Sequence, residues 1–210
     1  MEVEVKFRVD DPAIFTALTN VDQVNSYTLR LAAESEHQRN IYYDTADGVL
    51  RAARYGLRIR EVNGRSIATL KGPNQGHDGL HQRPEWELAA QSPDPSTWPP
   101  GAARDQALAL LGDRSLLPLL SIETMRRHIY AHTGGRDIAE ISLDEGTITA
   151  GARSESFCEL EIELLPEGTP DDLHALVTNL QERYTLIPEP RSKLERGLAL
   201  QDASTKSTSI

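Results

Sequence analysis

The chain has 210 residues, of which 39% are hydrophobic, and this is enough apolar material for one sizeable domain with a packed core. Its 32 acidic residues outnumber its 22 basic residues, so the net charge of -10 disfavours a nucleic-acid-binding surface unless basic side chains gather in one groove. A single cysteine excludes an internal disulfide, and without a long apolar run the chain is expected to be cytoplasmic and to have no membrane partner.

Alternation of polar and apolar residues, which is typical of half-buried strands, recurs through most of the chain. It predicts strands at residues 2–9, 29–44 (long or bent), 56–62, 66–71, 80–89, 122–132, 137–148 and 154–164. Asn63-Gly64 and Gly134-Gly135 accept the positive φ angles of tight hairpins. The pattern therefore predicts an α+β fold, mainly antiparallel β, with a closed eight-stranded barrel, because closure removes exposed sheet edges.

Helices are expected to flank this barrel. One begins after Asp10-Asp11-Pro12, a second covers residues 103–111, and a third follows Thr169, where Pro170 and two aspartates are typical of a first helical turn. The proline-rich residues 91–101 are expected to form a loop. Residues 201–210 lack apolar periodicity and are expected to form a flexible tail.

Charged residues fall on one face of several predicted strands. The rows of equal parity are Glu2, Glu4 and Lys6; Arg58 and Arg60; Arg83, Glu85 and Glu87; Glu140, Ser142 and Asp144; and Glu159, Glu161 and Glu163. A single row of this kind is more often a solvated surface than a site. Carboxylates in one row lie about 7 Å apart and repel one another, so a cation would stabilise the last row.

These rows suit a metal ion together with phosphate. Hard divalent cations prefer carboxylate oxygens, and Mg²⁺ usually combines one or two carboxylates with water and substrate phosphates. The obvious pool of metal ligands is Glu2, Glu4, Glu161 and Glu163. Arg58, Arg60 and Lys71 would suit a polyphosphate, because guanidinium and ammonium groups pair with phosphate oxygens. Since dry burial of ions is costly, the pattern predicts a water-filled barrel interior.

In their order along the chain, these motifs resemble those of the CYTH superfamily, also called the triphosphate tunnel metalloenzymes. The matching segments are E-x-E-x-K at residues 2–6, Y-Y-D-T at 42–45, L-R-x-R at 57–60, T-x-K-x-P at 69–73 and R-x-E-x-E at 83–87. Further matches are Thr124-Met125-Arg126, Leu143-Asp144, residues 159–164 and Ser192-Lys193. The resemblance spans nearly the whole chain and implies a single tunnel domain over residues 1–200.

The resemblance also implies roles for single residues. The implied phosphate contacts are Lys6, Arg58, Arg60, Lys71, Arg83, Arg126 and Lys193, of which all but Arg83 are expected to act in catalysis. The implied ligands of Mg²⁺ or Mn²⁺, directly or through water, are Glu2, Glu4, Asp144, Glu161 and Glu163. Glu85, Glu87 and Glu159 are expected to be supporting acids that orient basic residues or waters.

The superfamily that this sequence resembles includes several activities, namely inorganic triphosphatase, thiamine triphosphatase and class IV adenylate cyclase. Thiamine triphosphatases of the animal type carry a tryptophan just before the L-R-x-R strand, where this sequence has Gly56, and no stretch specifies a purine. We therefore expect a Mg²⁺- or Mn²⁺-dependent hydrolase that converts inorganic triphosphate to diphosphate and phosphate. The alternatives are the two other activities and a non-catalytic module that binds polyphosphate or a nucleotide. The expected partner is a small-molecule triphosphate and not nucleic acid, in a monomer or homodimer.

Overall fold

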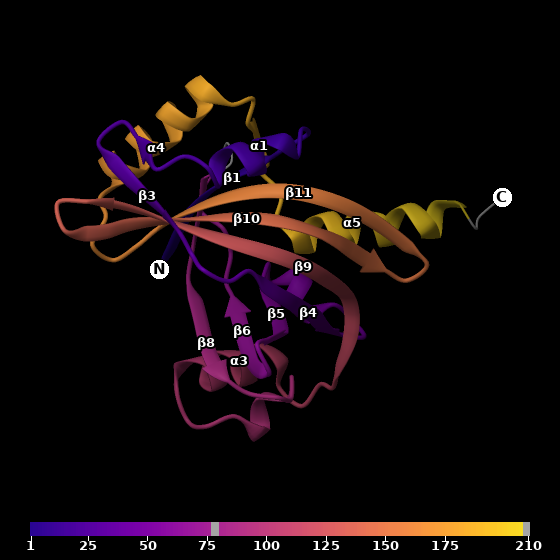
Figure 1. The fold of residues 1–210 in the computed structure, drawn as a ribbon. Coiled ribbons are helices and arrows are strands. Elements are labelled where there is room, and N and C mark those ends of the chain that lie inside the picture. Colours follow the sequence, from indigo (N-terminus) through magenta and orange to yellow (C-terminus); the bar gives the residue numbers. More distant parts are fainter. Residues whose placement is uncertain (77–79, 208–210) are drawn as a thin grey trace.

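The fold is that of a computed structural model, which describes residues 1–76 and 80–207. In these residues one mainly antiparallel sheet curls into a nearly closed barrel (Figure 1). The long strands of the barrel are β1 (Glu2–Arg8), β4 (Glu36–Thr45), β5 (Gly56–Val62), β6 (Arg65–Lys71), β9 (Leu116–Thr133), β10 (Arg136–Ala150) and β11 (Arg153–Leu164). Shorter strands are β2 (Gln23–Val24), β3 (Tyr27–Leu31), β7 (Leu80–Arg83), β8 (Glu85–Ala89) and β12 (Ile187–Pro188).

The barrel closes through the segment at residues 80–89, which the sequence predicts as a single strand. Pro84 interrupts it, because proline has no N–H to donate to a sheet ladder. β8 then pairs with β6, whereas β7 pairs with β1, so the two halves join opposite ends of the strand order β1-β11-β10-β9-β4-β5-β6. With β7 and β8 taken as one interrupted strand, the barrel has the eight antiparallel strands that the alternation predicts.

Two strand boundaries differ from the prediction. The expected long strand at residues 29–44 is divided into β3 and β4, which pair one after the other with the same edge of β9. β9 itself begins at Leu116, six residues before the predicted Ile122, and its length leaves room for both partners. The predicted hairpins are confirmed, since Asn63 and Gly64 have φ angles of 50° and 72°, and Gly134 and Gly135 have φ angles of 57° and 82°.

Most of the helices cover the outside of the barrel, whereas the last one packs against the inner face of the sheet and lines the cavity (Figure 1). The helices are α1 (Ala13–Leu18), α2 (Val49–Ala52), α3 (Ala102–Leu111), α4 (Pro170–Arg183) and α5 (Lys193–Ser207), with a 3₁₀ turn (Pro95–Thr97) inside the predicted loop. α1, α3 and α4 confirm the predicted helices, and Thr169 caps α4 by accepting a hydrogen bond from the Asp172 N–H. α5 continues through Ser207 into the segment expected as a tail, whose last three residues lie outside the described residues.

Most of the apolar packing lies between the barrel wall and the helices outside it, but a third cluster, which includes Ile122, Ile148 and Phe157, packs against α5 on the inner face of the sheet. α1 and α4 cover the face of β10 and β11 that carries Ile141, Leu160 and Ile162 (Figure 1). α2 and α3 lie over Leu57 and Leu70 of β5 and β6. Around the cavity, most apolar residues of the strands therefore face outward to a helix, and the alternating polar residues face the barrel interior.

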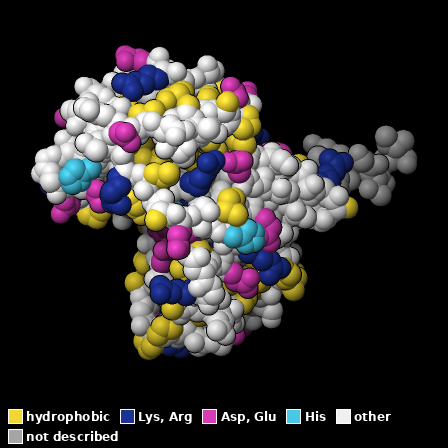
Figure 2. Space-filling model, in the orientation of Figure 1, with side chains coloured by type: hydrophobic (Ala, Val, Ile, Leu, Met, Phe, Trp, Pro, Cys, Tyr) yellow, Lys and Arg dark blue, Asp and Glu magenta, His cyan; other side chains and the backbone are white. Residues whose placement is uncertain are grey.

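On the face shown in Figure 2, Lys and Arg side chains are interspersed with Asp and Glu. Within residues 1–76 and 80–207, no helix has the length and apolar character needed to cross a membrane.

Candidate active site

The barrel interior is a cavity of about 920 Å³, and the polar faces of the strands line it. Every residue predicted to contact phosphate or metal lies along this one cavity. Those residues are Glu2, Glu4, Lys6, Arg58, Arg60, Lys71, Arg83, Arg126, Asp144, Glu161, Glu163 and Lys193. Glu85 and Glu87 also line it. The charged rows of separate strands therefore converge on a common space.

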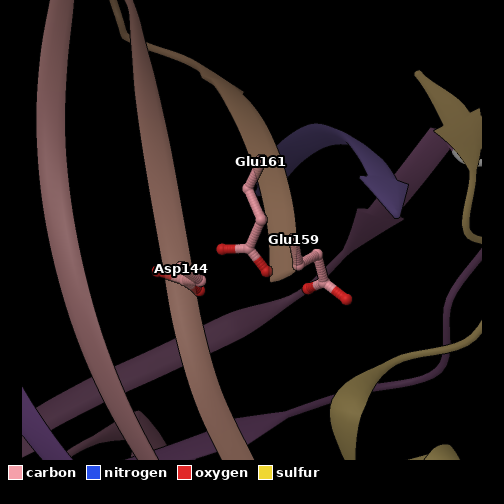
Figure 3. Close-up of side chains that lie close together, drawn as sticks. All are labelled: Asp144, Glu159 and Glu161. Carbon is pink, nitrogen blue, oxygen red and sulfur yellow. The ribbon is translucent and has the colours of Figure 1, made fainter. Parts of the chain in front are cut away.

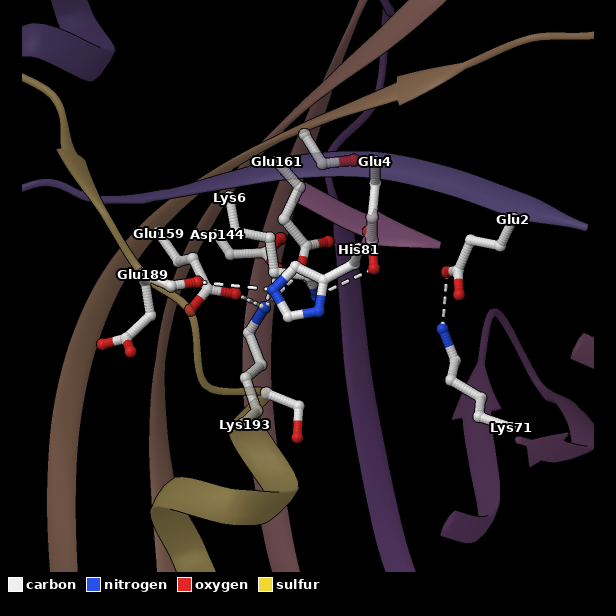
Figure 4. A network of polar contacts seen from close by, with 12 residues as sticks. Glu2, Glu4, Lys6, Lys71, His81, Asp144, Glu159, Glu161, Glu189 and Lys193 are labelled. Carbon is white, nitrogen blue, oxygen red and sulfur yellow. Dashed lines mark hydrogen bonds and ion pairs between the residues drawn. The ribbon is translucent and has the colours of Figure 1, made fainter. Parts of the chain in front are cut away.

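Lys193, at the start of α5, occupies the centre of one acidic group. Asp144, Glu159 and Glu161 place one carboxylate oxygen each within 4.8 Å of one another (Figure 3). The Lys193 ammonium group lies 2.9 Å from Asp144 and 2.8 Å from Glu161, and it also donates to Glu159 (Figure 4). Arg126 binds Asp144 through two hydrogen bonds of 2.6 Å each. In this structure the acids are thus neutralised by side chains of the protein.

Burial and ion pairing compete in this group. Burial alone would raise the pKa of Glu161, but Lys193, Lys6 and Arg126 outweigh it and hold that pKa well below its usual range. Burial raises the pKa of Glu159, whose ion pairs with cations only partly compensate for desolvation. Glu159 does not line the cavity; it is fully buried and contacts Lys193 and Arg196.

A second acidic group lies on β1 and β11. Glu2 accepts hydrogen bonds from Lys71 at 2.7 Å and from Arg83 at 2.8 Å, and Arg83 also donates to Glu4 at 2.9 Å. Glu163 is the register partner of Glu4 across the two strands. Burial, together with the charges of Glu4 and Glu2, raises the pKa of Glu163 to about 7. Negative charge here is therefore less completely compensated than around Lys193.

Arg58 and Arg60 form a third group, on β5. Their nearest carboxylate is Glu87, at 4.0 Å from Arg58 and 3.9 Å from Arg60, and Glu87 itself accepts a hydrogen bond from Thr69. The Nε atoms of both arginines are buried, and among the described residues neither has a hydrogen-bond partner. Buried donors are rarely left unpaired in proteins. Arg58 also hydrogen-bonds the phenol of Tyr42, so the donors without a partner in these two guanidinium groups are the Nε atoms.

The cavity also contains polar residues that the sequence analysis does not assign to the site. They are Glu36, Gln38, Asn40 and Tyr42 on β4; Thr124 and His128 on β9; and Glu140 on β10. The signal that could have found them is parity, since positions 36, 38, 40 and 42, and positions 124 and 128 with Arg126, alternate like the charged rows. His128 is held between two acids, with Nδ1 2.7 Å from Glu140 and Nε2 3.4 Å from Glu36.

The donor chemistry of the cavity fits a hard divalent cation. The acids around Glu163 offer carboxylate oxygens, which Mg²⁺ and Mn²⁺ prefer, and they outnumber the two histidines of the cavity lining, His81 and His128. The raised pKa of Glu163 reflects burial and the repulsion of neighbouring carboxylates, which a cation would relieve. The group at Lys193 fits less well, because a lysine side chain already fills the space between its three acids.

Known proteins share both the sequence features and the fold. A family model described as the CYTH domain matches residues 1–198. An inorganic triphosphatase from Haemophilus influenzae is 30% identical over 172 residues, which make up 79% of this chain and 47% of that protein. The chain thus spans about half the length of this curated relative.

Two solved structures illustrate the shared fold. A candidate adenylyl cyclase from Hippeastrum, described as having a dominant triphosphatase activity, superposes with a TM-score of 0.62 at 19% identity, over 95% of this chain and 96% of that chain. A protein from Pyrococcus horikoshii superposes with a TM-score of 0.61 at 24% identity, over 96% and 99% of the two chains. At such identities the similarity establishes the fold alone.

Proposed function

Because the chain belongs to the CYTH domain family, we propose that it hydrolyses inorganic triphosphate to diphosphate and phosphate with the help of Mg²⁺ or Mn²⁺. The activity of the Haemophilus influenzae relative supports this choice of substrate. So does the chemistry of the cavity, which combines carboxylates with lysine and arginine in one enclosed space.

Two buried arginines support this function most directly. The Nε atoms of Arg58 and Arg60 lie buried without partners in the described structure, on a wall of the cavity. Guanidinium groups bind phosphate oxygens through paired, charge-assisted hydrogen bonds, so a triphosphate would satisfy these donors. Tyr42 lies beside them, and although burial opposes it, the charges of Arg58, Lys71 and Arg83 lower the pKa of its phenol. The environment around Arg58 is thus strongly positive.

In the proposed reaction, the side chains of the protein bind the anion and orient a water molecule. The water oxygen bonds to the terminal phosphorus, the bridging P–O bond on the opposite side breaks, and its electron pair leaves with diphosphate. Arg58, Arg60 and Lys71 hold the departing diphosphate and stabilise its charge. A carboxylate that lines the cavity accepts the proton of the water.

Glu2, Glu4 and Glu163 are the proposed holders of the divalent ion. When bound, the ion would neutralise charge on the phosphate oxygens and make the coordinated water more acidic. Glu2 and Glu4 are paired with Lys71 and Arg83 in this structure. A triphosphate would draw such cations toward its own oxygens, and it would thereby leave the carboxylates free for the metal.

The proposal favours inorganic triphosphate over thiamine triphosphate. Gly56, at the position where the animal-type enzymes carry tryptophan, faces α5, and a Cβ atom added there would lie 3.0 Å from Cδ2 of Leu194. The space for an aromatic platform is therefore occupied by the helix.

The proposal is tested by phosphate release from triphosphate, ATP and thiamine triphosphate, with Mg²⁺, with Mn²⁺ and with a chelator, and cyclic AMP is measured in the same reactions. We expect triphosphate to be the best substrate, and chelation to stop its hydrolysis. Arg58→Ala should lower kcat/KM by about 10²-fold or more, whereas Arg65→Ala, which removes an exposed arginine outside the cavity, should change it less than about twofold.

Other outcomes would replace the proposal. Formation of cyclic AMP from ATP would favour a cyclase, and faster turnover of thiamine triphosphate would favour the thiamine enzyme. Tight binding of triphosphate without release of phosphate would favour a binding module.

A further inference from the structure

Beyond the inner arginines, two further arginines line the cavity, and the proposed reaction does not use them. They are Arg51, on α2, and Arg54, in the turn between α2 and β5. β4 lines the cavity from Glu36 to Asp44, a length of about 27 Å at the usual rise of a strand. Because α2 follows the end of β4 directly, these arginines lie at the Asp44 end of the cavity. Both are exposed, so they stand where the cavity meets solvent.

The acids at this end are already used in helix caps. Asp44 accepts hydrogen bonds from the backbone N–H groups of Leu50 at 2.8 Å and of Arg51 at 3.0 Å. Glu195, which also lines the cavity, accepts from the backbone and the hydroxyl of Ser192 at the start of α5. Neither carboxylate pairs with Arg51 or Arg54 in the described structure, so the positive charge of the two arginines is not cancelled by the cavity wall.

The two arginines themselves have little ionic compensation. Arg51 lies 3.8 Å from Asp202, and both side chains are more than half exposed, so this pair contributes little. No ion pair with Arg54 occurs among the described residues. Its backbone has a φ of 61°, a conformation that is uncommon for a residue with a side chain and that holds the turn between α2 and β5 in place.

Outer and inner arginines form one continuous series along residues 51–60. Arg54 and Arg58 are four residues apart, so their Cα atoms are separated by about 14 Å at most. Gly56 lies between them and packs directly against Leu194 on the facing helix. An anion that contacts both pairs of arginines would therefore run along the cavity beside this contact, and not between the two residues.

We propose that Arg51 and Arg54 form an outer subsite that binds the additional phosphates of linear polyphosphates longer than three units. This inference rests on the proposed function and names the class of substrate that the same cavity would prefer. The two cations attract an anionic extension, and they repel the positively charged thiazolium ring of thiamine triphosphate. The enzyme would thus discriminate between substrates by the charge of the group that is attached to the triphosphate, further phosphates being favoured over a cationic organic group.

The test compares KM and kcat for triphosphate, linear tetraphosphate and longer linear polyphosphate. The variant is Arg51→Ala with Arg54→Asn, since asparagine tolerates the left-handed backbone at position 54. In the wild type we expect KM to be about tenfold lower for tetraphosphate than for triphosphate, because one or two charge-assisted contacts can supply such a difference. In the double variant we expect the KM values for tetraphosphate and triphosphate to become equal. The control is Arg65→Ala, which removes an exposed charge from the β5–β6 hairpin and should leave the ratio of the two KM values as in the wild type.

Several results would overturn the subsite. One such result is an equal KM for triphosphate and tetraphosphate in the wild type. Another is an equal rise of both KM values in the double variant. A third is that the double variant loses only its turnover of ATP or of thiamine triphosphate. Binding of the same phosphates to chelator-treated protein, measured by calorimetry, separates this inference from the proposed reaction. A protein that binds tetraphosphate more tightly than triphosphate without hydrolysing either would contradict the reaction and still support the subsite.

Discussion

At the scale of the residue, Glu163 shows most clearly how the cavity is built for a ligand. It lies opposite Glu4 in the ladder between β1 and β11, and both line the cavity. Burial and the charges of Glu4 and Glu2 raise the pKa of Glu163 from 4.5 to about 7. The protein therefore keeps a carboxyl group in a place where its ionised form is costly, and this makes sense if a cation normally accompanies it.

This cost predicts a pH dependence of folding. A carboxyl group whose pKa is raised in the folded state destabilises that state as pH rises from the unfolded pKa of about 4.5 through the folded pKa of about 7. We expect Glu163→Gln to be more stable than the wild type at pH 8, by about 1 to 3 kcal/mol, and nearly equal to it at pH 4.5. Urea unfolding at several pH values, in a chelating buffer, measures this difference.

The exposed Glu167 provides the control for that series. Glu167→Gln should leave the free energy of unfolding nearly unchanged across the same pH range, because its carboxylate stays in water. In the wild type, Mg²⁺ should recover most of the stability lost at pH 8, and it should do less for Glu163→Gln. A difference between Glu163→Gln and the wild type that does not vary with pH would contradict the assignment of the raised pKa.

At the scale of the element, the turn from β4 into α2 shows how the backbone positions the cavity entrance. Asp44 is buried, and its carboxylate accepts hydrogen bonds from the N–H groups of Thr45, Leu50 and Arg51. This cap allows a helix of only four residues to form, and the helix places Arg51 beside the cavity. The aspartate of the Y-Y-D-T motif therefore has a structural task.

Removal of this cap should destabilise the protein. Asp44→Ala leaves several buried N–H groups without an acceptor, and we expect it to lower the free energy of unfolding by about 1 to 3 kcal/mol. Asp44→Asn keeps one acceptor oxygen and should lose less. Asp113→Ala, which changes an exposed aspartate after α3, should lose less than about 0.5 kcal/mol. Equal stability of Asp44→Ala and Asp113→Ala in urea unfolding would show that the cap has no such role.

Elements also show what could be predicted from the sequence. The barrel strands follow from alternation and from hairpins such as Asn63-Gly64, because these signals are local. The change of partner at Pro84 could not be predicted, since the residue shows where a ladder breaks but not which strands lie on either side. Nor could α2, whose four residues have no periodicity and depend on a cap from Asp44.

At the scale of the whole molecule, the two apolar clusters under α1 to α4 lie outside the barrel, while the charged residues line its interior. Ile162 is fully buried under α4 and α1, while its neighbours Glu161 and Glu163 line the cavity. Alternation predicts that neighbouring residues lie on opposite faces of a strand, but it does not predict which of the two faces is turned toward the barrel interior. The order of several motifs along the chain indicates that the charged rows converge, but it does not identify cavity residues that those motifs do not assign to the site, such as Asn40, Thr124 and Glu140.

This separation predicts that stability and activity depend on different sets of residues. Ile162→Ala removes packing outside the cavity and should lower the free energy of unfolding by about 2 to 5 kcal/mol, while each folded molecule keeps its activity. Arg60→Met removes a charge whose Nε has no described partner, so stability should stay equal or rise by about 1 to 2 kcal/mol. The same change should lower triphosphate hydrolysis by about 10²-fold or more. Urea unfolding and phosphate release measure the two effects.

Arg60→Met and Ile162→Ala are expected to differ in stability because only Ile162 packs in an apolar cluster of the folded state. Glu87 retains its hydrogen bond from Thr69 when Arg60 is replaced, so no new buried charge is left alone. The charges of the cavity then cost folding free energy that the outer apolar clusters must supply, as is common where a site is kept ready for a ligand. If Arg60→Met were as unstable as Ile162→Ala, the cavity wall would instead be part of what holds the barrel together, and the separation of the two sets would be wrong.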